Sequence, residues 1–142
     1  MPKIIFLDID GTLVDYETKM PLSAKTAVDT ARNNGHKVYL CTGCSKAEVL
    51  QRNLCETDGM ICGNGTYVED HGTVVLKNGL SKEDTRRIVD WCNSRQTGFY
   101  LESNAGLFCN KYMKQQGVET MIKYSLGKEN NLTKATFLPK QP

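Results

Sequence analysis

Two aspartates separated by one residue follow a short apolar run near the amino terminus. The run from Ile4 to Leu7 is succeeded by Asp8 and Asp10, and then at once by Gly11. β-Branched and aromatic residues predict a strand buried on both faces, as in the middle of a parallel sheet. Because unpaired charges are costly to bury, we expect both acids at the carboxyl edge of this sheet, where open α/β sheets bind ligands. Side chains two residues apart also start on the same side of a strand.

This pair of acids could perform two kinds of chemistry. One carboxylate can attack as a nucleophile while the other transfers a proton, or the two can bind a divalent cation through oxygen. Gly11 would let the backbone turn tightly and lie close to a bound group. The alternative is a strand end with two solvated acids before a turn.

The pattern Asp-x-Asp-Gly-Thr-Leu at residues 8–13 resembles the first motif of the haloacid dehalogenase-like (HAD) superfamily of phosphatases. The resemblance implies that Asp8 is the nucleophile that becomes an aspartyl-phosphate, and that Asp10 is the general acid and base. It also implies Mg²⁺ as the cofactor, held by Asp8 and by Asp10, the latter through its backbone carbonyl.

Thr42 and Gly43 follow a second predicted strand over residues 36–41. A hydroxyl and the N–H groups of a tight turn suit a phosphoryl oxygen. The pair resembles the second motif of the same family, which implies that Thr42, Gly43 and Gly11 bind phosphate. Many relatives have an arginine where this chain has Cys44, so any contact made by that arginine is in doubt here. Taken alone, Thr-Gly is also compatible with a simple strand-ending turn.

Cys41 and Cys44 have Cys-x-x-Cys spacing. This spacing is compatible with a zinc or redox site, but the sequence has no second Cys-x-x-Cys or His-x₃-His pair to complete one. The alternative places Cys41 in a strand and Cys44 in the following loop. The amino terminus shows no signal segment, so we expect reduced thiols and a cytoplasmic location.

Residues 58–66 contain the turn-forming sequence Gly-Asn-Gly. They resemble the segment in which the chain leaves the core domain and enters the cap in the Cof-type branch (subfamily IIB) of the family. The resemblance implies a cap that closes over the substrate and excludes water. It makes Asn64 a candidate for contacting the substrate. An Asn-Gly turn with positive φ explains the same residues equally well.

The first half of the chain predicts alternating strands and helices. A helix with Ser23 as N-cap should end at Gly35, and the capping box from Ser45 to Glu48 should open a second helix. With a third strand over 59–62, residues 1–63 are expected to form a partial HAD-like core of β-α-β-α-β order. The fold class is therefore α/β, with part of a doubly wound, Rossmann-like parallel sheet.

Residues 64–142 predict a different arrangement, an α+β cap module inserted after the core and itself incomplete. A hairpin is expected over 66–76, a helix opened by a capping box at Ser81, and strands over 97–102 and 106–110. A further helix is predicted over 112–126.

The resemblance also predicts parts that this sequence does not contain. Members of the branch normally continue into a motif-three lysine and a Gly-Asp-x-x-Asn-Asp motif, and neither follows residue 66. The lysine would neutralise the phosphate, and the late aspartates would complete the Mg²⁺ shell. We therefore expect the chain to be the amino-terminal portion of such an enzyme, as a truncation, a fragment or a degenerate gene product, with little or no phosphatase activity.

Composition limits the partners. With 142 residues, a net charge of +2 and 39% hydrophobic residues, the chain is typical of a soluble globular protein of one domain or two small ones. Its basic residues are scattered, so neither nucleic acid nor a membrane is an expected partner. No apolar run approaches the length that crosses a bilayer.

The resemblance implies a Mg²⁺-dependent phosphatase acting on a small phosphorylated metabolite, such as a sugar phosphate or a phosphorylated cofactor. Two alternatives remain. A phosphomutase would use the same aspartyl-phosphate chemistry. A non-catalytic fragment could instead form a homo-oligomer, because half of a doubly wound sheet leaves an exposed sheet edge that invites pairing.

Overall fold

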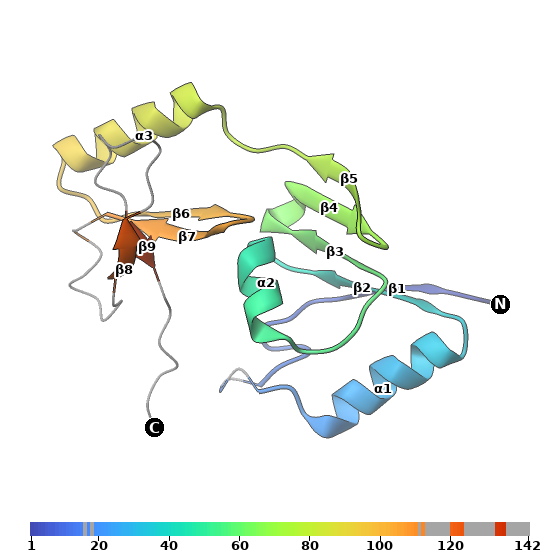
Figure 1. Ribbon diagram of the computed structural model, residues 1–142. Helices are drawn as coiled ribbons and strands as arrows, with labels where there is room; N and C mark the ends of the chain where they lie inside the picture. Colours follow the sequence, from blue (N-terminus) through green and yellow to red (C-terminus); the bar gives the residue numbers. More distant parts are fainter. Residues whose placement is uncertain (16, 18, 111, 113–119, 124–132, 136–142) are drawn as a thin grey trace. The chain divides into compact units, whose positions relative to one another are not determined.

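The computed structural model describes residues 1–15, 17, 19–110, 112, 120–123 and 133–135 (Figure 1). The chain divides into two compact units, Met1–Gly79 and Leu80–Pro142.

Five strands form one mixed sheet in the first unit, and they lie side by side in the order β1-β2-β3-β4-β5 (Figure 1). Their bounds are β1 Ile4–Leu7, β2 Lys37–Cys41, β3 Gly59–Cys62, β4 Tyr67–Asp70 and β5 Thr73–Lys77. The strands β1, β2 and β3 are parallel, whereas β4 and β5 are antiparallel to their neighbours. The predicted α/β class and the β-α-β-α-β order are confirmed.

Two helices provide the crossovers between the parallel strands. In α2 (Lys46–Arg52) the predicted capping box is present, because the Ser45 side chain accepts from the backbone N–H of Glu48 and the Glu48 side chain accepts in return. The start of α1 (Leu22–Asn33) differs from the prediction, since its N-cap is Pro21 rather than Ser23. The fixed φ of proline is compatible with the beginning of a helix, and the Pro21 N-cap makes no side-chain cap hydrogen bond.

The main core lies between these helices and one face of the sheet. Val28 of α1 and Val49 of α2 belong to the same buried cluster as Val38 and Leu40 of β2. Both helices therefore cover the same face. Val38 and Leu40 alternate with exposed or half-buried neighbours along β2, which is the period of a strand with one covered face.

One face of strand β1 is exposed, which corrects the prediction that the strand is buried on both faces. Ile5 and Leu7 pack against the core cluster, but Ile4 and Phe6 are 63% and 57% exposed. The physical reason is that α1 and α2 both cover the face of the sheet that carries Ile5 and Leu7, whereas Ile4 and Phe6 lie on the other face. Phe6 packs its ring against Tyr39, with ring centroids 5.7 Å apart.

The hairpin β4–β5 extends this sheet, whereas the sequence predicted a module boundary near Asn64. Strand β4 pairs with β3 from Gly59 opposite Asp70 to Cys62 opposite Tyr67. The short η1 turn (Gly63–Gly65) reverses the chain at once, so the next strand returns beside β3. The first compact unit consequently runs on to Gly79. The assignment of the two units as core and cap stays a prediction.

The second unit combines one described helix with an antiparallel sheet of order β6-β7-β9-β8. Its elements are α3 Lys82–Ser94, β6 Tyr100–Ser103, β7 Gly106–Cys109, β8 Thr120–Lys123 and β9 Thr133–Ala135. Ser81 caps α3 as predicted, accepting from the backbone N–H of Asp84. The helix predicted over 112–126 is wrong at residues 120–123, where β8 pairs with β9; most of its remaining length lies outside the described residues.

No helix within the described ranges combines the length and the apolar character that a membrane span requires.

Candidate active site

The two acids flank a tight turn at the carboxyl end of β1. Ile9 is fully buried between them, whereas Asp8 and Asp10 are exposed, as the alternation of a strand requires. The carbonyl of Ile9 accepts from the amides of three residues that follow, Thr12, Leu13 and Val14, at 3.0 to 3.3 Å. Gly11 has a φ of +78°, a conformation that favours glycine. The predicted strand-turn arrangement of Asp8, Asp10 and Gly11 is thus present.

Each acid has a different partner. Asp8 accepts from the hydroxyl of Thr12, with 3.3 Å between Oγ1 and Oδ2. Asp10 accepts from the guanidinium of Arg52, with 2.7 Å between Nη1 and Oδ1. Its other oxygen lies 3.5 Å from Sγ of Cys44. The two carboxylates therefore sit in unequal surroundings, which is how paired acids come to perform different tasks.

Thr42 is buried in the turn after β2. Its amide donates to the carbonyl of Ile61 at 2.9 Å, and its Oγ1 accepts from the amide of Cys44 at 3.1 Å. A hydroxyl that accepts in this way still has its own O–H to donate. Because Cys44 also reaches Asp10, the acid turn and the Thr42 loop meet at the carboxyl ends of two neighbouring strands.

Asn64 lies against the same loop. The backbone N–H of Asn64 donates to the carbonyl of Thr42 at 3.3 Å. The backbone of Asn64 has a φ of +54°, as expected of an Asn-Gly turn. A Cβ added at Gly43 would lie 3.3 Å from Oδ1 of Asn64, so Gly43 permits this close approach. The structure therefore brings Thr42, Gly43 and Asn64 together.

Burial sets the protonation of the groups around Asp10. Burial raises the pKa of the Cys44 thiol, and this outweighs the opposing hydrogen bond with Thr42. Cys44 is therefore a neutral thiol that can donate to the carboxylate. Burial lowers the pKa of Arg52, but the hydrogen bond to Asp10 and the neighbouring negative charges together outweigh it, so the net shift of the pKa is upward. Arg52 remains a full positive charge.

The sequence reasoning missed Arg52. Its contact with Asp10 spans 42 positions in the chain, and the residue belongs to no motif. It occupies the last turn of α2, where a basic residue is ordinarily explained by the helix dipole.

The oxygen atoms of the acid turn are of the kind that the expected metal, Mg²⁺, prefers. Asp8 and Asp10 present the hard oxygen ligands that suit Mg²⁺, an ion that keeps several waters and takes few protein ligands. Within the described ranges, no group of three or more His, Cys, Asp or Glu side chains could hold a metal. A cation here would depend on the two acids, on water and on the substrate. Cys41 and Cys44 are free thiols.

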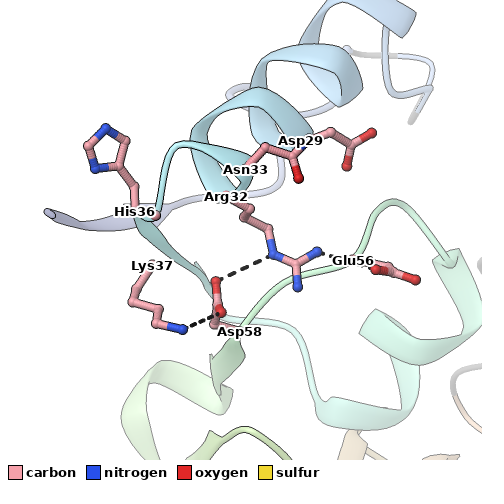
Figure 2. Close-up of a pocket in the computed structure, with 8 residues that line it drawn as sticks. Asp29, Arg32, Asn33, His36, Lys37, Glu56 and Asp58 are labelled. Atoms are coloured by element: carbon pink, nitrogen blue, oxygen red, sulfur yellow. Dashed lines mark hydrogen bonds and ion pairs between the residues drawn. The ribbon is translucent and has the colours of Figure 1, made fainter.

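A charged pocket lies elsewhere, at the amino ends of the strands (Figure 2). Asp58 is 8% exposed and accepts from the amide of Val38 at 2.9 Å. Figure 2 shows Arg32 and Lys37 converging on it, with nitrogen-to-oxygen distances of 3.4 and 3.2 Å, while His36 points away. These groups of the chain itself pair with both oxygens of the Asp58 carboxylate. We therefore interpret the cluster as structural.

We expect Asp58→Asn to lower the free energy of unfolding at pH 7 by about 2 kcal/mol, because it leaves buried donors without a charged partner. The backbone hydrogen bond from Val38 holds the pKa of Asp58 below its usual range. A lowered acid pKa stabilises the fold above the unfolded value and loses that contribution as pH falls through the folded value. The difference between the two proteins should therefore shrink in acid below about pH 4.

Urea denaturation at pH 7 and pH 3 measures this effect. Glu56→Gln is the matched control, because Glu56 pairs with the same Arg32 but is 88% exposed, and exposed pairs contribute under about 1 kcal/mol. Equal losses for the two variants would contradict the structural role of Asp58.

The comparisons with known proteins agree with this geometry. The family described as haloacid dehalogenase-like hydrolase matches residues 5–141. YkrA of Bacillus subtilis (strain 168) is 32% identical over 90 residues, which are 61% of this chain and 34% of that protein. Phosphatase YwpJ of the same organism is 27% identical over 124 residues, which are 84% of this chain and 41% of that protein. The chain thus spans about a third to two fifths of these relatives.

Solved structures show the same fold. BT1666 from Bacteroides thetaiotaomicron, studied among HAD superfamily phosphatases, superposes with a TM-score of 0.64 at 28% identity, covering 78% of this chain and 42% of that one. The HAD subclass IIB sugar phosphatase BT4131 gives a TM-score of 0.55 at 20% identity, covering 96% and 70%, and supports the fold alone. The resemblance read from the aspartate motif is confirmed: the chain belongs to the haloacid dehalogenase-like hydrolases.

Proposed function

We propose that this chain carries the nucleophile and part of the phosphate pocket of a phosphatase that acts on a small phosphorylated metabolite. One observation carries the proposal. The acid turn after β1 meets the Thr42 loop after β2 through the contact between Cys44 and Asp10. A nucleophile, a proton-transfer group and an oxygen-binding hydroxyl are therefore gathered at one sheet edge.

The proposed reaction proceeds in two steps. A carboxylate oxygen of Asp8 attacks phosphorus in line, forming an O–P bond as the bond to the leaving oxygen breaks. Asp10 donates a proton to that oxygen, and afterwards accepts a proton from the water that hydrolyses the aspartyl-phosphate. The hydroxyl of Thr42 and the amides of Gly11 and Gly43 hold the phosphoryl oxygens, and Asn64 contacts the substrate.

Mg²⁺ is the proposed cofactor, with Asp8 and Asp10 as its protein ligands. When bound, it would neutralise charge on the phosphoryl oxygens. The support is chemical, since carboxylate oxygens are its preferred ligands.

Covalent capture tests the proposal. The chain would be mixed with Mg²⁺ and acetyl phosphate, whose good leaving group needs no proton, and its intact mass would be measured. We expect one added phosphoryl group, which peptide mapping places on Asp8. No adduct, or an adduct on another residue, would contradict the proposal.

A second candidate function is self-association through the edge of β1. Ile4 and Phe6 are exposed there, and the strand from Ile4 to Leu7 carries no charge, proline or bulge that would discourage pairing. The partner in this candidate is a second copy of the chain.

Phe6→Lys tests it, because a lysine on an edge strand opposes pairing. Sedimentation velocity over a range of concentrations should show association for the unmodified chain and a monomer for the variant. Val75→Lys is the control, placed on β5, the other edge of the sheet. A chain that is monomeric at every concentration would remove this candidate, and disruption by the control alone would move the contact to β5.

A further inference from the structure

Arg52 contacts Asp10, one of the two proposed catalytic acids. Its Nη1 donates to Oδ1 of Asp10 at 2.7 Å, and its side chain is 26% exposed, beside a carboxylate that is 52% exposed. At this degree of exposure part of the Arg52 side chain is accessible to solvent. A guanidinium has five N–H donors, and the bond to Asp10 uses one of them.

The charge of the site explains why such a cation matters. Asp8, the proposed attacking carboxylate, carries a negative charge where a phosphoryl group, itself an anion, must approach, and Asp10 adds a second whenever it is not holding the proton it transfers. Like charges within a few ångströms repel, and more strongly at a protein surface than in bulk water. A fixed guanidinium offsets part of this repulsion and can bind phosphoryl oxygens through paired N–H groups.

Other groups near the loop are less suited to the task. Lys46 follows the Thr42 loop, but its ammonium is engaged by the hydroxyl of Tyr67 at 2.9 Å and by the carboxylate of Glu69. Cys44 contacts Asp10 as a neutral thiol. Arg52 thus combines a positive charge with spare donors at the acid turn.

We propose that Arg52 is an anion-binding residue of this site: Nη1 holds Asp10 while the remaining N–H groups bind oxygen atoms of the substrate's phosphoryl group. The inference rests on the proposed function and deepens it, because it assigns the pocket a cation from the end of α2. The helix then links the two halves of the site, with its first turn beside the Thr42 loop and its last residue on the acid turn.

Binding of inorganic phosphate to the full chain, without metal, tests the proposal by isothermal titration calorimetry. We expect Arg52→Met to weaken binding on the order of tenfold, as for loss of a hydrogen bond to a charged group. Arg52→Lys should recover part of the lost binding, because lysine keeps the positive charge but lacks the paired N–H donors of a guanidinium. Arg87→Met is the charge-matched control, since Arg87 is 75% exposed in the other unit. Circular dichroism verifies that each variant is folded.

Asp10→Asn separates direct contact from simple neutralisation of Asp10. If Arg52 touches phosphate, removing Arg52 should still weaken binding about tenfold when Asp10 is already neutral. If the effect disappears in that background, Arg52 only offsets the charge of Asp10 and the proposal is wrong.

Thr42→Val distinguishes failure of this inference from failure of the proposed function. If Thr42→Val weakens phosphate binding and Arg52→Met does not, the pocket stands and the role of Arg52 is overturned. If the unmodified chain binds no phosphate, or if none of the variants alters binding, the proposed phosphate pocket is refuted as well.

Discussion

Replacement of Gly59 by alanine should lower the free energy of unfolding by about 3 kcal/mol, one of the largest losses expected for a single methyl group in this chain. The added Cβ would collide with the backbone carbonyl of Glu69 and would lie 2.8 Å from Cε1 of Tyr39. The carbonyl cannot withdraw easily, because β4 is hydrogen-bonded on both sides, to β3 and to β5.

The same substitution should disturb the candidate site, because β3 leads directly into the turn that carries Asn64. Urea denaturation followed by circular dichroism measures the loss. Gly79→Ala is the matched control, since a Cβ there meets no atom within 4 Å, and its effect should stay within about 0.5 kcal/mol. Similar stabilities for the two alanine variants would show that β3 and β4 are not packed as described.

Asp8→Asn should abolish covalent phosphorylation by acetyl phosphate, with a loss of at least about a thousandfold in the rate of adduct formation. An amide is not a nucleophile of comparable strength, and the turn around Ile9 should keep its geometry, because Asp8 is exposed. The measurement is the fraction of chain carrying a phosphoryl group, followed by intact mass over time.

Asp10→Asn tests the second step of the proposed reaction, hydrolysis of the aspartyl-phosphate. If Asp10 activates the hydrolytic water, its amide variant should still accept the phosphoryl group from acetyl phosphate but release it more slowly, on the order of a hundredfold. The adduct should therefore persist in this variant and be absent in Asp8→Asn. Adduct formation by Asp8→Asn would refute the assignment of the nucleophile.

Much of the local structure was predictable, because it depends on residues close together in the chain. The capping box at Ser45 and the cap at Ser81 are present because a side chain and a backbone amide three residues away meet in any helix start. Alternation of exposure around Ile9 follows from strand geometry. The aspartate motif likewise sufficed to predict the family that the comparison over residues 5–141 confirmed.

Features that depend on distant pairing were not predictable in the same way. The hairpin of β4 and β5 has the same local sequence pattern whether it stands alone or extends a sheet, so its pairing with β3 was missed. Strand β8 was mistaken for a helix, because only its partner β9 selects the extended form.

The sequence by itself determined the acid turn, the Thr42 turn, the starts of α2 and α3, and the family, since short-range sterics and hydrogen bonding are encoded in neighbouring residues. Only the tertiary structure decided that the first unit runs to Gly79, that one face of β1 is exposed, and that Arg52 reaches Asp10. The reason is that a contact across 42 positions depends on where the whole helix packs, and no local pattern of residues specifies that.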